Sequence, residues 1–358
     1  MSIIEVNQLI VDSISGDISR GGWEASCSFM NAQSYADYSR RAEIFHLDEG
    51  AGVWGDEWLL GIRGFILPQQ IVWDRGQSAT EITLSTSNYF LNRAAVQGIF
   101  FSTPVVDVNN PHQAAVWTLG KIVKHIIEEH TNVTDWVDDS GIDTTDSTSV
   151  NVYTVKESES IWDSIKRIGE NEFYVPYFTK KDEFIYKVHP MFAVALPEPV
   201  MEIDYRYIIG QPVVTYLEKT MYDQVQLYAL TDEGAILQSF FPANIGSDGR
   251  RYKQSNIRCN SQPRLDTLAQ RLSMYLRKQF DVQLTMPGAW GLNMELYDRI
   301  ELTYNGTARN GVDFAWNQKK FWIKSIQVRR QFNFGAVTEL QLEEESYEEG
   351  YFYSDYTT

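Results

Sequence analysis

The sequence has little cysteine. Among its 358 residues only Cys27 and Cys259 are cysteines, and neither belongs to a CxxC or Cys/His cluster. Small secreted domains held by disulfides are rich in cysteine, and zinc sites need closely spaced ligands. We therefore expect two buried thiols and no metal site, in a protein made in a reducing cytoplasm.

Basic residues are scarce relative to acidic ones. The chain has 31 Lys and Arg against 48 Asp and Glu, which gives a formal net charge of −17. A protein that holds nucleic acid by its phosphates needs the opposite balance. The composition therefore argues against specific nucleic-acid binding. It is typical of a surface to which DNA does not stick, and ordinary solubility accounts for it equally well.

Long hydrophobic runs are also missing. No apolar run approaches the ~18 residues of a membrane-spanning helix. The first residues, Met1–Val6, do not combine a basic region with a long apolar run, so they predict no signal peptide. The hydrophobic share is nevertheless 43%, which predicts a sizeable core and excludes wholesale disorder.

No catalytic or nucleotide-binding motif is present, since GxSxG, P-loop, GxGxxG and HExxH patterns are all absent. The five histidines are scattered along the chain: His46, His112, His125, His130 and His189. His125 and His130 share a predicted helix, but five residues place them about 140° apart around it. They therefore do not form the two-histidine face of a metalloprotease helix.

Paired carboxylates are the remaining candidates for catalysis. Asp135 with Asp138, or Glu295 with Asp298, could in principle serve glycoside hydrolysis. In a chain with 48 carboxylates such pairs arise by chance, and solubility explains them better. We therefore expect no enzymatic activity, no catalytic residue and no cofactor.

Strands are predicted in the first third of the chain. Residues 23–29 alternate between apolar and polar side chains, which is typical of a strand with one buried and one wet face. Further strands are expected over residues 42–47, 58–66, 70–73 and 81–85, with Gly21-Gly22 at a loop tip and a turn at residues 74–77. Several short strands at such intervals predict a sandwich or barrel.

The middle third changes character. An amphipathic helix is predicted over residues 111–130, followed by a polar, acidic connector over 138–149. A second helix, over about 159–168, has Ser158 or Ser160 as its cap and Gly169 as its stop. A hairpin over 173–188 and a proline-containing linker over 193–199 complete this part.

Residues 261–344 are predicted to form one helix followed by a series of strands, around which the rest of the chain is organised. Ser261 and Pro263 mark the helix start. The apolar stripe of this helix consists of Leu265, Leu268, Ala269, Leu272 and Leu276. Strands then follow, with turns expected at Asn305-Gly306 and Asn310-Gly311. We expect the helix to pack on the antiparallel strands that follow it.

The order of elements predicts four parts. They are a β domain over residues 1–110, a mixed α/β insert over 111–200, a second β domain over 201–345 and a tail over 346–358. Alternation is lost from Glu343 onward, where EEESYEEG carries five carboxylates, so we expect this segment not to pack into a core. The tail aromatics Tyr351, Phe352, Tyr353 and Tyr356 are the candidate interface residues, the alternative being a frayed terminus.

Several segments together carry a family resemblance. Residues 153–169, YTVKESESIWDSIKRIG, resemble the opening of a LysM module, although ESES stands where a LysM module has Gly-Asp-(Thr/Ser). With the hairpin YVPYFTKKDEFIYKVHP and the later segments NMELYDRIEL and FWIKSIQV, the order of parts resembles the baseplate hub proteins of contractile phage tails, the late-control D-protein family. The resemblance covers roughly residues 10–345.

The resemblance implies a mainly β fold with an α+β insert: two tail-tube-like β-barrel or sandwich domains flanking a small α/β domain. It implies a homotrimer that presents six similar units to a hexameric tube, with the tail tube protein above and the central spike below. Other baseplate proteins would be further partners, DNA would pass through the ring, and the protein would lie in the virion after synthesis in the host cytoplasm.

Two other classes of function stay open from the sequence. A peptidoglycan- or carbohydrate-binding protein would use the LysM-like segment and the chain's 10 Trp and 20 Tyr. A cell-wall glycosidase would need a cleft with two convergent carboxylates.

Overall fold

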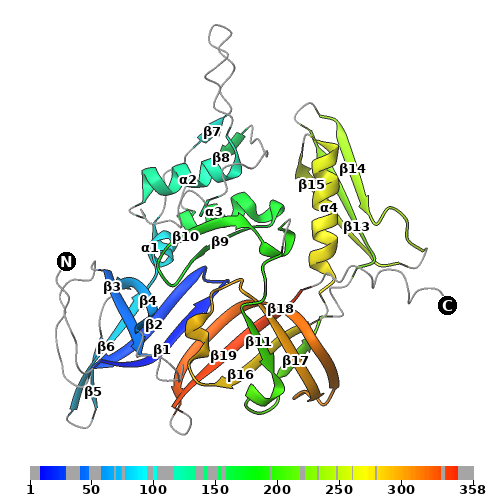
Figure 1. The fold of residues 1–358 in the computed structure, drawn as a ribbon. Helices are drawn as coiled ribbons and strands as arrows, with labels where there is room; N and C mark the ends of the chain where they lie inside the picture. The colour runs from blue at the N-terminus through cyan, green and yellow to red at the C-terminus, as the bar shows by residue number, and fades with distance from the viewer. Residues whose placement is uncertain are drawn as a thin grey trace. The chain divides into compact units, whose positions relative to one another are not determined.

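The computed structural model describes residues 9–29, 41–47, 58–67, 70–74, 77–94, 100–102, 117–131, 133, 141–142, 152–154, 159–193, 196–217, 222–231, 234–246, 249–259, 261–278, 280–331 and 335–345. The fold is mainly β, with large antiparallel sheets and a few helices (Figure 1). Two compact units divide the chain. The first comprises Met1–Ala193, Thr285–Asp298 and Ile323–Leu340, and the second Val194–Leu284, Arg299–Trp322 and Gln341–Thr358. The four-part division expected from the sequence stays a prediction.

The first unit contains a sheet built largely from the start of the chain. Its strands are β1 (Leu9–Asp17), β2 (Gly22–Phe29), β3 (Arg41–Leu47), β4 (Trp58–Ile66), β5 (Gln70–Asp74), β6 (Gln77–Ser85) and part of β18 (Asp313–Gln331). The order is β18-β1-β2-β6-β4-β3, with β5 beside β6. Trp23, Ala25 and Cys27 are buried while Ser26 is exposed, so the alternation predicted for β2 is confirmed.

The turn predicted at Gly21-Gly22 is confirmed, because residues 18–21 connect β1 to β2 and Gly22 begins β2, and this turn packs inward. Gly21 has a φ of +74°, and a Cβ there would lie 1.7 Å from Cζ2 of Trp162. The Gly21 carbonyl also accepts a hydrogen bond from the Phe178 backbone N–H, at 2.9 Å. The positive φ and the lack of space for a Cβ both require glycine at position 21, because only glycine has no side chain and adopts a positive φ at no steric cost.

Among the described residues, three helices and two short ladders complete the first unit. They are α1 (Asn88–Arg93), α2 (Leu119–His130), α3 (Ile161–Gly169), β7 (Phe100–Ser102) paired with β8 (Val152–Thr154), and β9 (Tyr174–Phe178) paired with β10 (Phe184–Val188). Short 3₁₀ turns lie at Glu170–Glu172, Pro190–Phe192 and Trp290–Asn293. One apolar cluster joins α2, α3 and the β9–β10 hairpin, with Trp162, Phe178 and Phe184 almost inaccessible at its centre.

Local sequence signals explain the helix ends. The Ser160 hydroxyl accepts the Asp163 backbone N–H at 3.0 Å, so the predicted cap of α3 is confirmed, and the helix ends at Gly169 as expected. The start predicted for α2 is wrong within the described residues. Thr118 has an extended backbone and accepts from the Lys121 N–H, which makes it the cap. Residues 111–116 lie outside the described part.

The second unit contains a sheet of order β12-β16-β19-β18-β17-β11. Its strands are β11 (Met201–Asp204), β12 (Val213–Tyr216), β17 (Arg299–Thr307) and parts of β16 (Phe280–Pro287), β18 and β19 (Gly335–Glu344), with a 3₁₀ turn at Tyr205–Tyr207. The turn predicted at Asn305-Gly306 is wrong, because both residues lie inside β17. The turn from β17 to β18 is the second predicted one: the Asn310 side chain accepts the Val312 N–H and Gly311 has a φ of +82°.

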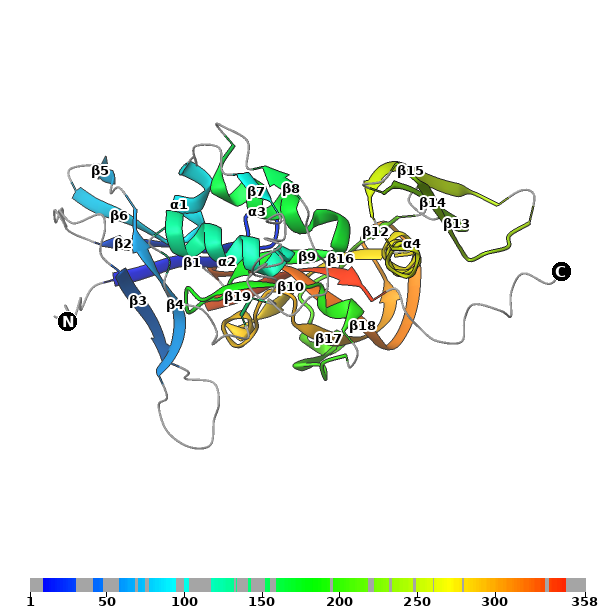
Figure 2. The same ribbon diagram turned by 90° about the horizontal axis from the view of Figure 1, so that it is seen from above.

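Helix α4 (Gln262–Leu276) covers a separate three-stranded sheet of the second unit. This sheet has the order β14-β13-β15, from β13 (Gln224–Leu230), β14 (Ile236–Phe241) and β15 (Arg251–Arg258). Leu265, Leu268 and Ala269 pack with buried residues of β13, and α4 lies along β13 and β14 (Figures 1 and 2). The expectation that this helix packs on the strands after it is therefore wrong: its partners precede it.

Candidate functional site

The last three described residues form a charged site of the second unit that is held by ion pairs. Glu343, Glu344 and Glu345 follow one another at the end of β19, and their side chains are only 8%, 8% and 4% exposed. Each carboxylate has its own cation, in the pairs Lys278–Glu343, Lys319–Glu344 and Arg299–Glu345. The expectation that the chain stops packing at Glu343 is therefore wrong. Three ion pairs, each with a buried carboxylate, hold this stretch to the fold where apolar alternation is missing.

The three ion pairs of Glu343, Glu344 and Glu345 are called the ion-pair clamp below. The predicted interface residues follow it in the sequence. Tyr351, Phe352, Tyr353 and Tyr356 lie outside the described residues, so their role stays a prediction. Glu345, the last described residue, is held at its backbone as well, because its N–H donates to the Lys320 carbonyl at 3.0 Å.

Glu295 and Asp298, one of the two carboxylate pairs considered for glycoside hydrolysis, lie close together in the structure. The Asp298 carboxylate accepts the Glu295 backbone N–H at 2.6 Å, and the Glu295 carboxylate accepts the Lys180 backbone N–H at 3.2 Å. The Lys180 ammonium lies 3.8 Å from the Glu295 carboxylate and donates to the Leu292 carbonyl. These bonds fix the turn of the β9–β10 hairpin within the first unit. Asp135 and Asp138 lie outside the described residues.

Burial sets the protonation of this cluster. Desolvation raises the pKa of Glu295 to about 7, although the Lys180 charge opposes the shift. Desolvation also raises the pKa of Asp298 and lowers the pKa of Lys180. The cluster has a structural role, because both carboxylates accept hydrogen bonds from backbone N–H groups and so hold the β9–β10 turn in place.

The histidines and cysteines occupy separate places. His189 is buried, and its Nδ1 accepts the Met191 N–H at 3.2 Å, while His125 packs against Trp117. Cys27 and Cys259 are free and buried, as expected, and burial raises the pKa of Cys27 to about 12. Across the part of the chain that the structure describes, no three His, Cys, Asp or Glu residues group so that they could hold a metal ion. None of the described helices is long and apolar enough to cross a membrane.

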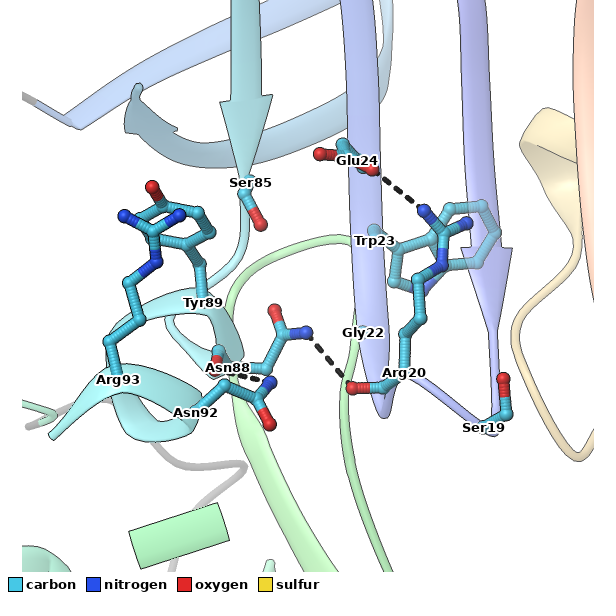
Figure 3. A pocket seen from close by; sticks show the side chains of 10 residues that line it. All are labelled: Ser19, Arg20, Gly22, Trp23, Glu24, Ser85, Asn88, Tyr89, Asn92 and Arg93. Carbon is cyan, nitrogen blue, oxygen red and sulfur yellow. Dashed lines mark hydrogen bonds and ion pairs between the residues drawn. The ribbon is translucent and has the colours of Figure 1, made fainter. Parts of the chain in front are cut away.

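A polar pocket of the first unit lies between the β1–β2 turn and α1 (Figure 3). Arg20 is paired with Glu24 at 2.7 Å, and the Asn88 amide donates to the Arg20 carbonyl at 3.0 Å. The Arg93 guanidinium lies 4.2 Å from the centre of the Tyr89 ring. The polar groups drawn in Figure 3 thus bond mainly to one another, and the pocket contains neither Glu295 nor Asp298.

The open face of the small sheet in the second unit exposes large apolar side chains. Side chains alternate along β13, so the buried Val225, Leu227 and Ala229 face α4, and Tyr228 and Leu230 face away. Leu230 pairs with Ile236 of β14, and their exposed fractions are 51% and 69%. Sequence reasoning missed this surface. The period-2 pattern places apolar residues on both faces, which is typical of a covered strand.

Comparisons with known proteins place this fold. No known family model matches the chain, and no curated protein sequence matches it. The chain is similar to a tail protein from Neisseria meningitidis, with 12% identity, a TM-score of 0.62 and coverage of 95% of this chain and 94% of that one. The 43 kDa tail protein of prophage MuSo2 from Shewanella oneidensis has 8% identity, a TM-score of 0.59 and coverage of 95% and 98%.

A third similar structure is a component of the type VI secretion system of E. coli. It shares 9% identity and a TM-score of 0.51, with coverage of 97% of this chain and 77% of that one, and is described as similar to the T4 bacteriophage tail proteins gp27 and gp5. The chain therefore has the fold of these tail proteins over nearly its whole length.

Proposed function

We propose that this chain is a structural subunit of a phage tail baseplate: the hub that joins the tail tube to the central spike. The observation that supports the proposal is a fold match over 95% of the chain to two phage-type tail proteins, with almost equal coverage of each. A match at this coverage includes the small sheet, the α/β part and the larger sheets together. It favours a tail role over a stand-alone glycan-binding module, which would need only the LysM-like segment.

Three copies form a ring in this proposal. Two tube-like β domains in each chain present six similar units to a hexameric tube, which resolves the mismatch between three-fold and six-fold symmetry. The formal charge of −17 supports DNA passage, because carboxylates that line a channel repel phosphates. The partners are then the tube protein, the spike protein and neighbouring baseplate proteins, with no enzymatic activity in the hub itself.

The tail over residues 346–358 serves as a docking segment of this assembly. Its aromatic residues Tyr351, Phe352, Tyr353 and Tyr356 are of the type that anchors interfaces. The ion-pair clamp at Glu343–Glu345 supports this role, since it ends the folded strand directly before the tail.

Electron microscopy of the purified full chain tests the proposal. We expect ring-shaped particles with three-fold symmetry and a central opening, and a trimer mass by mass photometry. Particles that remain monomeric at micromolar concentration, or rings of another symmetry, would contradict the hub assignment. Incubation with purified peptidoglycan is the companion measurement, and release of soluble fragments would contradict the non-enzymatic role.

A further inference from the structure

The open face of the β14-β13-β15 sheet has an apolar centre. Cross-strand partners share a face, so Leu230 with Ile236 and Gln226 with Phe240 lie side by side on the face away from α4. Phe240 is 39% exposed, and its ring centre lies 6.0 Å from that of Tyr228. A contiguous exposed group of this kind marks an interaction surface.

The same sheet is basic, which is unusual in this chain. Strands β13, β14 and β15 contain no Asp or Glu, and β15 carries Arg251, Lys253 and Arg258. Arg251 and Lys253 are exposed, and the Lys253 ammonium lies 4.9 Å from the centre of the Tyr228 ring. The cations therefore border the apolar centre. A partner that fits this surface combines apolar or aromatic side chains with carboxylates.

The tail of this chain has that composition. Residues 346–358 contain Glu348, Glu349 and Asp355, five aromatic residues and no Lys or Arg. We propose that the tail of a neighbouring copy docks on the open face of the β14-β13-β15 sheet. Its aromatic side chains cover Leu230, Ile236 and Phe240, and its carboxylates face Arg251 and Lys253.

The number of residues in the tail sets an upper limit to its reach. Thirteen residues of extended chain span up to about 43 Å beyond Glu345. The span starts from Glu345, which is held by Arg299 and by the Lys320 carbonyl. The assignment to a neighbouring copy rests on the proposed ring of three, in which every tail has an adjacent sheet.

Peptide binding tests the surface. A fluorescein-labelled peptide of residues 346–358 is titrated with the chain truncated after Glu345, and fluorescence anisotropy follows binding. We expect saturable binding that Leu230→Ser with Ile236→Ser weakens at least about tenfold, since two large apolar contacts are lost. Val312→Ser is the matched control, because Val312 is 50% exposed elsewhere in the second unit. No binding, or equal weakening by Val312→Ser, overturns the proposal.

Charge is tested in the same assay. Lys253→Glu is expected to weaken binding about tenfold at low salt, and Lys320→Glu, at an exposed position on β18, to leave it unchanged. Circular dichroism melting of each variant separates lost binding from lost folding. Equal effects of both substitutions would show non-specific attraction only and overturn the assigned surface.

A mixing experiment decides between a neighbouring copy and the same copy. Protein truncated after Glu345 has a sheet but no tail, and full-length protein with Leu230→Ser and Ile236→Ser has a tail but a damaged sheet. Docking between copies predicts more association in the mixture than in either protein alone, measured by analytical ultracentrifugation at equal total concentration. Peptide binding without association on mixing assigns the tail to its own sheet. A three-fold ring seen without peptide binding would refute the docking and leave the hub intact.

Discussion

The Arg299 guanidinium binds the Glu345 carboxylate through two parallel hydrogen bonds. Nε donates to Oε2 at 2.6 Å and Nη2 donates to Oε1 at 2.7 Å, with side-chain exposures of only 7% and 4%. Nη1 donates to the Pro197 carbonyl at 2.9 Å. The planar guanidinium therefore joins the end of β19 to the segment that precedes β11, within the second unit.

Arg299→Lys should destabilise the second unit, because an ammonium cannot form the paired bonds and leaves buried oxygen atoms unsatisfied. We expect a loss of about 3 kcal/mol in the free energy of unfolding, measured by urea denaturation. Arg206→Lys, at an exposed pair with Asp204, is the control and should leave the unfolding midpoint unchanged. Equal effects of the two substitutions would show that the buried fork is unimportant.

Gly21→Ala should destabilise the first unit strongly, since the new Cβ would overlap the Trp162 ring at a positive φ. We expect a loss of about 3 kcal/mol or more in the free energy of unfolding. Gly234→Ala separates strain from overlap: Gly234 has a φ of +84° with nothing within 4 Å, so about 1 kcal/mol is expected. If Gly21→Ala costs no more than this control, Trp162 can move aside and the packing is looser than described.

Leu268→Asp and Leu272→Asp should differ. Leu268 is 3% exposed against the small sheet, whereas Leu272 is only partly buried beside the same cluster. We expect Leu268→Asp to unfold this sheet and its helix, and Leu272→Asp to cost about half as much, because its carboxylate can reach water. Thermal melting followed by circular dichroism compares them. Equal melting temperatures for the two variants would show that the helix is rotated from its described position.

Stability of the first unit should fall as pH rises from 5 to 8. The folded pKa of Glu295, about 7, lies above its ordinary value of 4.5, so the folded state binds more protons than the unfolded state between these values. Urea denaturation should give a free energy of unfolding about 1–2 kcal/mol lower at pH 8 than at pH 5. Glu295→Gln should flatten much of this slope. Asp298, whose pKa is also raised, accounts for the pH dependence that remains in this variant. An unchanged slope in the variant would assign the pH dependence elsewhere.

Much of the fold follows from local signals in the sequence. The cap at Ser160 and the stop at Gly169 act within a few residues, so the limits of α3 could be predicted. Alternation over residues 23–29 likewise shows which side chains of β2 are buried. The apolar stripe of α4 predicts which face of the helix is buried, but it does not predict which strands that face packs against. The strands it covers precede the helix, and the sequence pattern favours the strands that follow.

The anchored strand end could not be read from the sequence for a different reason. Glu343, Glu344 and Glu345 look like the start of a solvated acidic tail, and each partner is far away in the chain: Lys278, Lys319 and Arg299. Only the fold brings these charges together. The approach of Glu295 to Lys180 depends on long-range packing in the same way, since 115 residues separate them.

The three consecutive ion pairs at Glu343–Glu345 also bear on how the end of β19 would respond to a pulling force. A pull on the tail reaches Glu345 first, and the charges of Arg299, Lys319 and Lys278 resist it one after another along the strand. Separating each pair requires exposing buried charges, which is costly over a short displacement. Under a pulling force, the end of β19 would therefore separate from the sheet only after these ion pairs break.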